Sequence, residues 1–337
     1  MNIVITGGNG FIGRRLARRL LDGGAVVRPD GSRARLDTVV LVDVARLDDH
    51  LGSDERVVQV IGDIADRSTL AGAIDADTAA VFHFGAVVSA GAEADFDLGL
   101  RVNLDGTRNV LDVCRRLPVP IRLIFASSLA VYGGALPAVI DDATPLYPQT
   151  SYGMHKACGE LLVSDYSRKG YIDGRALRFP TILVRPEPNL AASTFASTIV
   201  REPLLGRATS CPVNAASVMA VMSTARLIDC VVRAYELPPE AFGAQRALLL
   251  PAISASVEAI IAAVRRAGGD AAADRIVFRP DAPTQRIVDG WPAGVDAVRA
   301  RELGFHADAT VDEIVETFVA SDLAALRLAE SSRSAIR

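Results

Sequence analysis

The sequence predicts an α/β fold, in which a doubly wound parallel sheet is joined by a smaller, interleaved C-terminal lobe. Short apolar runs alternate with longer helical patterns up to Pro180. Strands that are apolar throughout are typical of a parallel sheet with helices on both faces. After Thr181 this rhythm changes to proline-punctuated stretches such as REPLLGRATSCPVN, which indicate a less regular lobe.

The expected strands and helices follow in strict alternation. The strands cover Asn2–Thr6, Thr38–Asp43, Arg56–Ile61, Ala79–Phe84, Ile121–Ser127 and Arg175–Pro180. Between them, segments such as GRRLARRLLD and FDLGLRVNLDGTRNVLDVCRRL are amphipathic. Right-handed crossovers then place helices on both faces of the sheet. We expect residues 1–180, with part of 224–251 returning to them, to form the sheet domain, and 181–223 with 252–330 to form the second lobe.

The composition is that of an ordinary globular protein and argues against several classes of function. The 337 residues are 50% hydrophobic and 23% charged, with a net charge of -4. This balance argues against a nucleic-acid partner, and we find neither an apolar run of membrane-spanning length nor a secretory signal. The four cysteines form no CxxC pair and the four histidines are scattered. We therefore expect free thiols, no metal site and a cytoplasmic protein without a membrane partner.

Three glycines follow the first strand in the stretch TGGNGFIG. At Gly7, Gly10 and Gly13 the chain must turn sharply, let its backbone approach a ligand and pack the next helix closely on the strand, and glycine permits all three. The helix N-terminus would then offer N–H groups to a pyrophosphate. Because a strand precedes and a helix follows, we predict a dinucleotide-binding loop and not merely a structural turn.

An acidic residue at the end of the next sheet strand indicates which dinucleotide binds. Asp43 ends the run TVVLVD, and the intervening GGAVVRPDGSRARLD has the character of a surface insertion. A carboxylate at this place hydrogen-bonds ribose hydroxyls and repels a 2′-phosphate, so NAD is favoured over NADP. Asp30 is another candidate for the ribose-binding acid, but no convincing strand precedes it. The nearby Arg46 would favour NADP. A structural role for Asp43, as a helix cap, is the alternative to ribose binding.

A second constellation, FASSLAVYGG followed by PQTSYGMHKACGELL, suits hydride transfer. Tyr152 and Lys156 are four residues apart at the start of a helical pattern, so their side chains share a face. A free tyrosine has a pKa of about 10, which a neighbouring ammonium and a positive nicotinamide ring would lower. Ser128, at the end of the fifth strand, would hold the substrate oxygen while the phenolate removes the proton. Each residue alone could be structural, as we expect for His155.

These residues identify the chain as a member of a known family. It resembles the extended short-chain dehydrogenase/reductases, also called the NAD-dependent epimerase/dehydratase family, in TGGNGFIG, VDV, GDI, HFGA, NLDGT, SSLAVYG, SYGMHKA, LRFPT and ARELGF. The resemblance runs almost end to end and implies a Rossmann fold with NAD as cofactor. It implies a cofactor site made of Gly7, Gly10, Phe11, Ile12, Gly13, Asp43, Asp63, Ile64, Gly85, Ala86, Asn103, Tyr152, Lys156 and Pro180.

Within this family, the likeness is strongest to dehydrogenases that oxidise the C2 hydroxyl of a four-carbon sugar acid with NAD. It is carried by EADFDLGLRVNLDGTRN and FASTIVREPL and weakens over NAASVMAVMSTAR. The implied catalytic residues are Tyr152, Lys156 and Ser128, and the implied substrate site is Ser128, Tyr152, Ser89 and Thr181. The substrate carboxylate needs a charge-assisted partner, for which the candidates are Arg178, Arg185, Arg201 and Arg207.

Two other functions stay open at this point. A sugar-nucleotide 4-epimerase, or another sugar dehydrogenase of the family, would use the same tyrosine, lysine and serine. A dinucleotide-sensing regulator is a further alternative, although such proteins commonly lack an intact tyrosine–lysine pair. The family commonly dimerises through two helices, here those with VNLDGTRNVLDVC and YGMHKACGELLV, so we expect a homodimer in which Ala157 and Gly159 permit close approach.

Overall fold

The computed structural model describes residues 1–28, 30–47, 49, 51–187 and 191–328, and it confirms the α/β class. The chain divides into two compact units. The first comprises Met1–Val131, Leu146–Phe179 and Ile228–Leu249. The second comprises Tyr132–Pro145, Pro180–Leu227 and the described residues from Leu250 onward. Residues 329 and 330, which we expected to end the second lobe, lie outside the described residues.

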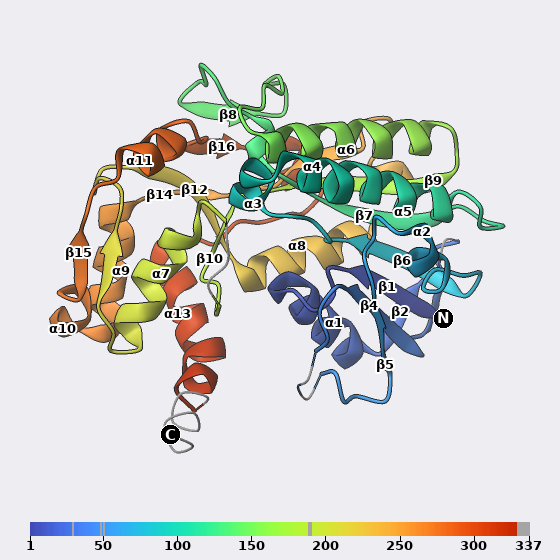
Figure 1. Ribbon diagram of the computed structural model, residues 1–337, viewed down its shortest axis with the longest axis horizontal. Coiled ribbons are helices and arrows are strands. Elements are labelled where there is room, and N and C mark those ends of the chain that lie inside the picture. The colour runs from blue at the N-terminus through green and yellow to red at the C-terminus, as the bar shows by residue number, and fades with distance from the viewer. Residues whose placement is uncertain (29, 48, 50, 188–190, 329–337) are drawn as a thin grey trace. The chain divides into compact units, whose positions relative to one another are not determined.

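A seven-stranded parallel sheet forms the centre of the first unit (Figure 1). The strand order is β13-β9-β7-β6-β1-β4-β5. The expected strands are confirmed, with ends that differ by up to three residues, and the short β13 in the returning segment adds a seventh. The strands are β1 (Asn2–Thr6), β4 (Thr38–Asp43), β5 (Val57–Ile61), β6 (Thr78–His83), β7 (Ile121–Ser128), β9 (Ile172–Phe179) and β13 (Ala247–Leu249).

Helices cover both faces of this sheet. On one face lie α5 (Gly106–Cys114) and α6 (Ser151–Arg168), and on the other lie α1 (Phe11–Gly23) and the last turns of α8 (Thr224–Glu236) (Figure 1). Val110 of α5 and Val163 of α6 are fully buried in one cluster with Leu123 and Phe125 of β7. Burying such side chains contributes roughly 1.5–3 kcal/mol each, so apolar packing holds these helices on the sheet.

A π-helical stretch interrupts the amphipathic segment that precedes β7. The structure has α4 (Phe96–Gly99), a π-helical stretch from Leu100 to Asp105, and then α5. Asn103 in this stretch accepts a hydrogen bond from Val87 N (2.7 Å) and donates one to Val87 O (2.9 Å). The local change of helix type therefore presents a polar side chain to the loop that follows β6. Such stretches occur frequently at functional sites.

The insertion before β4 is an antiparallel hairpin of β2 (Ala25–Val27) and β3 (Arg33–Arg35). Its turn carries Asp30, whose exposed carboxylate accepts hydrogen bonds from Ser32. Asp30 thus follows a hairpin strand and not a strand of the parallel sheet, so the structure does not support it as a rival to Asp43.

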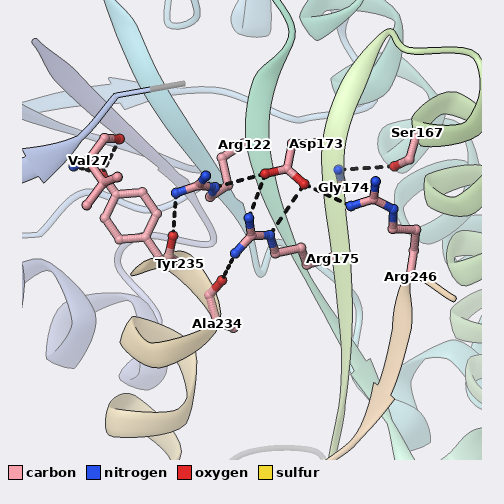
Figure 2. Close-up of polar contacts among 9 residues, drawn as sticks. All are labelled: Val27, Arg122, Ser167, Asp173, Gly174, Arg175, Ala234, Tyr235 and Arg246. Carbon is pink, nitrogen blue, oxygen red and sulfur yellow. Dashed lines mark hydrogen bonds and ion pairs between the residues drawn. The ribbon is translucent and has the colours of Figure 1, made fainter. Parts of the chain in front are cut away.

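The end of α8 is fastened to the first unit by polar contacts (Figure 2). The Tyr235 hydroxyl bonds both the N–H and the carbonyl of Val27 (2.6 and 2.9 Å). Arg122 donates to the Tyr235 carbonyl and Arg175 to the Ala234 carbonyl. Both guanidinium groups also contact one carboxylate, that of Asp173 at the start of β9. Because carbonyls at a helix C-terminus carry partial negative charge, they stabilise these buried cations.

The second unit is less regular and has its own apolar core, which includes Ile199, Val221, Ile260 and Ile314. Its sheets are β10-β12-β14, β11-β15 and β8-β16. Since β8 pairs with β16, residues 132–145 belong to this unit and not to the sheet domain in which we had placed them. The strands are β8 (Val139–Asp141), β10 (Thr181–Leu183), β11 (Thr209–Cys211), β12 (Val218–Ser223), β14 (Ile253–Ser256), β15 (Ile276–Phe278) and β16 (Gly294–Asp296).

The remaining helices are short. In the second unit they are α7 (Thr194–Leu204), α9 (Val257–Gly268), α10 (Asp270–Ala273), α11 (Ala282–Asp289), α12 (Val298–Glu302), α13 (Val311–Phe318) and a π-helical stretch, Val319–Leu323. In the first unit they are α2 (Arg67–Ala71), α3 (Ser89–Ala94) and two 3-10 turns, Leu129–Val131 and Pro239–Ala241. Among the helices of the described residues, none combines the length and apolar character needed to cross a membrane.

Candidate active site

The glycine loop between β1 and α1 is closely packed against its surroundings. Gly7 has a φ of +66°, and a Cβ atom added to it would lie 2.7 Å from the backbone N of Gly85. A Cβ atom on Gly13 would lie 2.4 Å from the Gly7 carbonyl oxygen. Gly10, directly before α1, is exposed. The loop thus presents bare backbone at a helix N-terminus, where anions are stabilised. Phe11 and Ile12, both half-buried, form the first turn of α1.

Asp43 lies beside this loop, at the end of β4. Its Oδ2 accepts the backbone N–H of Asn9 (3.1 Å), and its Oδ1 accepts that of Ala45 (3.3 Å). The Asn9 side chain donates from Nδ2 to Ala45 O and to Gln59 Oε1 (3.4 Å). Because Nδ2 faces two acceptors, the amide orientation is determined, and the Asn9 Oδ1 acceptor is buried without a hydrogen-bond partner.

The residues expected at the adenine and along the cofactor follow β5 and β6. Asp63 accepts a hydrogen bond from Arg101 (2.6 Å) and from Ala65 N (2.9 Å). Ile64 is buried, and its side chain packs near Gly85, where an added Cβ atom would lie 3.2 Å from Ile64 Cδ1. Ala86 is half-buried in the loop after β6, and Ser89 is the first residue of α3.

A row of buried hydrogen bonds connects these loops. Thr107 Oγ1 donates to the Asn103 carbonyl (2.6 Å) and contacts His83 Nε2 (2.9 Å). Thr6 Oγ1 contacts His83 Nδ1 (2.7 Å) and accepts from Gly85 N (3.2 Å). Burial, reinforced by the charge of Lys156, lowers the pKa of His83 to about 3. The ring is therefore neutral, with its proton on Nε2 donated to Thr107, and Nδ1 accepts from the Thr6 hydroxyl.

Tyr152 and Lys156 lie one turn apart at the start of α6, whose first turn is capped by Thr150 Oγ1 (3.1 Å from Gly153 N). Lys156 is only 4% exposed, and its Nζ lies 4.8 Å from the centre of the Phe125 ring. The same atom lies 5.5 Å from the centre of the Tyr152 ring. Burial lowers the pKa of Lys156 to about 7. The two groups are therefore placed to influence each other's charge.

Ser128 is the last residue of β7, and its Oγ accepts the Ala130 N–H (3.1 Å). The turn after Ser128 touches the start of α6, since a Cβ atom on Gly153 would lie 2.1 Å from Ala130 O. Asp43 and Ser128 lie at the carboxyl ends of parallel strands, and the glycine loop and Gly85 follow such ends. This is the edge at which open α/β sheets bind ligands.

The remaining residues predicted for the site lie in the second unit or are engaged in ion pairs. Pro180 and Thr181 begin the second unit, where Pro180 is buried and Thr181 is half-buried at the start of β10. Among the arginines, three pair with glutamates: Arg178 with Glu160, and both Arg201 and Arg207 with Glu202. Arg185 donates to Ser193 Oγ (3.2 Å). Among the described residues no group of three potential ligands could hold a metal ion, and all four cysteines are free thiols.

The sequence reasoning missed three contributors to this site. Glu160 is buried one turn beyond Lys156, a position that its spacing would have revealed. Gly153 lets α6 approach the turn after Ser128. Asn9, within the glycine loop itself, supplies a buried acceptor beside Asp43. The glycine loop, the carboxylate at β4 and the buried lysine together fit a dinucleotide with a pyrophosphate, a ribose and a reactive ring.

Comparison with known proteins agrees with a site that fits a dinucleotide. The chain is 49% identical over 323 residues to the D-erythronate dehydrogenase of Cupriavidus necator, covering 95% of this chain and 98% of that protein. It is 38% identical over 324 residues to the D-erythronate dehydrogenase of Haemophilus influenzae, covering 96% and 100%. The crystal structure of the nucleoside-diphosphate-sugar epimerase from Agrobacterium tumefaciens superposes with a TM-score of 0.89 at 37% identity, covering 96% and 95%. Residues 3–226 match the NAD dependent epimerase/dehydratase family, and the chain belongs to this family.

Proposed function

We propose that this protein is an NAD-dependent dehydrogenase that oxidises the C2 hydroxyl of D-erythronate to give 2-dehydro-D-erythronate. Two relatives that cover nearly the whole chain are D-erythronate dehydrogenases. The observation that carries the chemistry is the buried ammonium of Lys156, 5.5 Å from the ring centre of Tyr152, on the same helix. An ammonium at this distance stabilises the anionic phenolate, and a phenolate is a base of suitable strength for an alcohol oxidation.

The proposed reaction breaks two bonds of the substrate. The Tyr152 phenolate removes the proton of the C2 hydroxyl, and the C2–H bond breaks as the C2=O bond forms. NAD, when bound, takes up the hydride that leaves C2. The Ser128 hydroxyl donates a hydrogen bond to the same oxygen and orients it toward Tyr152. A positioned general base contributes about 10²- to 10⁴-fold to such a rate.

The cofactor contacts are proposed from the same edge of the sheet. The bare backbone of Gly7, Gly10 and Gly13, with Phe11 and Ile12, receives the pyrophosphate, and Asp43 receives the adenosine ribose. The remaining contacts are assigned to Asp63 and Ile64 at the adenine, and to Gly85, Ala86, Asn103 and Lys156 toward the nicotinamide. Because the substrate carboxylate is an anion, its binding favours the charged form of Lys156.

The substrate is tested by a panel of three- to six-carbon aldonates with NAD, scored by NADH absorbance. We expect D-erythronate to give the highest kcat/KM, with Ser89 as a pocket wall beside Ser128 and Tyr152. NADH formation with a different acid and not with D-erythronate would refute the substrate, and no NADH with any acid would refute the reaction.

A second candidate is a sugar-nucleotide epimerase, which the fit to the Agrobacterium tumefaciens structure favours. In an epimerase the hydride returns to the substrate, so no NADH accumulates. Incubation with nucleotide sugars and a trace of NAD, followed by chromatography, distinguishes the two reactions. Interconversion of two sugars without net reduction would support the epimerase and contradict the dehydrogenase.

The assembly that we propose is a homodimer in the cytoplasm, built through α5 and α6. An outward stripe of α6 carries Met154, Ala157 and Cys158, all half-buried, and Leu161, which is 68% exposed. Gly159 is not part of this stripe, because an added Cβ atom would lie 2.4 Å from Phe125 Cζ; our expectation that it faces a partner was wrong. Replacing Leu161 with Glu should give monomers in sedimentation, and a monomeric unmodified protein would contradict the dimer.

The proposed cytoplasmic location is supported by the four free thiols, which suit a reducing compartment.

A further inference from the structure

We propose that Glu160 is a positioning residue for the oxidation: its buried carboxylate holds the serine end of β7 and the tyrosine–lysine helix in one fixed geometry. This inference rests on the proposed function. Glu160 is 3% exposed. It follows Lys156 by four residues, as Lys156 follows Tyr152, so the three side chains come from successive turns of α6.

The carboxylate connects three elements of the first unit. Its Oε1 accepts a hydrogen bond from Ser127 Oγ at 2.5 Å and one from Arg178 Nε at 3.0 Å. Its Oε2 accepts one from Arg178 Nη2 at 2.7 Å. Ser127 in β7 and Arg178 in β9 are also directly paired in the sheet. One side chain of α6 therefore ties the helix to two neighbouring strands at their carboxyl ends.

The location of these contacts matters for the chemistry. Ser127 directly precedes Ser128, the proposed partner of the substrate oxygen, and Lys156 stands one turn before Glu160. The helix is already pressed on β7, because Gly159 leaves no room for a Cβ atom over Phe125. Apolar contact sets the distance between α6 and β7 but permits the helix to slide along the strand. The hydrogen bonds that Ser127 and Arg178 donate to the Glu160 carboxylate fix the orientation of the helix as well. Displacement of a reacting group by about 1 Å can cost about 100-fold in rate.

The same unit provides a matched control. Asp173 is a half-buried carboxylate in β9, held by Arg122, Arg175 and Arg246 (Figure 2). It lies at the start of β9, whereas Arg178 lies near its end. Removing its charge should destabilise the fold without disturbing the carboxyl edge. If the role of Glu160 were purely structural, Glu160→Gln and Asp173→Asn would both lower the melting temperature and leave kcat unchanged.

The experiment compares Ser127→Ala, Glu160→Gln and Asp173→Asn with the unmodified protein, using D-erythronate and its C2-deuterated form. We expect Ser127→Ala and Glu160→Gln to lower kcat about 10- to 100-fold, with NAD affinity unchanged within about twofold and a larger deuterium isotope effect on kcat, because hydride transfer becomes slower. Asp173→Asn should lower the melting temperature and keep kcat within about twofold per folded site. Should Glu160→Gln fail to fold, Ser127→Ala alone decides, since it removes only one hydrogen bond.

Three outcomes would overturn the proposal. The first is an unchanged kcat and isotope effect in Ser127→Ala and Glu160→Gln, with only the melting temperature reduced. The second is recovery of kcat in the double variant Glu160→Leu/Arg178→Met, which would show that an unpaired Arg178 charge, and not lost positioning, caused the defect. The third is absence of NADH formation by the unmodified protein, which alone would also refute the proposed function.

Discussion

The Nζ atom of Lys156 lies 5.5 Å from the centre of the Tyr152 ring and 4.8 Å from that of Phe125, between the helix and the strand beneath it. The ammonium is thus flanked by two aromatic faces and shielded from water. Aromatic faces attract cations, but this attraction does not replace hydration, and burial lowers the pKa of Lys156 to about 7. A lysine that changes charge near neutral pH can respond to the binding of anions.

Replacing Tyr152 with Phe removes only the hydroxyl that we propose as the base. We expect kcat to fall by at least about 100-fold, while NAD affinity, measured by calorimetry, stays within about threefold. Tyr147→Phe is the matched control, because Tyr147 is 66% exposed, and it should retain full activity. Turnover by Tyr152→Phe at the normal rate would mean that another group is the base.

The charge of Lys156 can be followed directly by NMR, because Lys169 is the only other lysine in the sequence. In the protein without NAD, the Lys156 signal should titrate at about pH 7, whereas Lys169 is exposed. Saturation with NADH, whose nicotinamide ring is neutral and whose phosphates are anionic, should move the Lys156 midpoint upward. Assignment through Lys169→Arg checks which signal is which, and a Lys156 midpoint above pH 10 in the free protein would contradict the burial effect.

Asp43 should determine the preference for NAD over NADP. A hydrogen bond to a charged group contributes about 1.5–3 kcal/mol, so Asp43→Ser should raise KM for NAD about 10- to 100-fold. The same change removes the repulsion of the 2′-phosphate of NADP. The kcat/KM for NADP should therefore come closer to the kcat/KM for NAD. Asp30→Ser, in the exposed hairpin turn, is the control and should change neither value. Equal effects at both positions would refute the assignment.

The Asp173 cluster should contribute to the acid stability of the first unit. Burial alone would raise the pKa of Asp173, but the hydrogen bonds and charges of Arg175 and Arg122 outweigh it and lower the pKa below 3.8. Its stabilising contribution is therefore complete above about pH 4 and lost as the pH falls through the lower folded-state value. Asp173→Asn should reduce the free energy of unfolding by about 3–5 kcal/mol in urea titrations at pH 7. Asp165→Asn, in an exposed pair with Arg168, should cost under about 1 kcal/mol.

His83 should make the protein less stable as the pH falls. Its folded-state pKa is about 3 against an ordinary 6.5, so between these values the unfolded chain binds a proton that the folded protein does not. The free energy of unfolding should fall by up to about 1.4 kcal/mol for each pH unit below 6.5. His83→Gln removes the titrating ring and should flatten this slope, while His306→Gln, at an exposed position, should leave it unchanged. An equally steep slope in His83→Gln would assign the effect to other groups.

The sequence predicted the parts of this molecule that depend on local pattern. Strands buried on both faces are continuous apolar runs, and the glycine loop combines a strand, a turn and a helix within a few residues. The β13 strand is only three residues long, and its partner β9 lies about 70 positions earlier, so no local pattern marks it. The assignment of 132–145 failed for the same reason, since β8 is paired with β16 far along the chain. Glu160 has a visible spacing, but its partner Arg178 became apparent only in three dimensions.

The hydrogen-bonded row from Gly85 through Thr6, His83 and Thr107 to Asn103 has a chemical consequence. It starts at a backbone amide and stops at a backbone carbonyl, and neither group ionises at physiological pH. Such a row cannot conduct a proton to or from the substrate, however well its members are aligned. Its role is structural, because it holds the loop after β6 at a fixed distance from the π-helical stretch that contains Asn103. The proton taken up by Tyr152 must therefore reach solvent by another route.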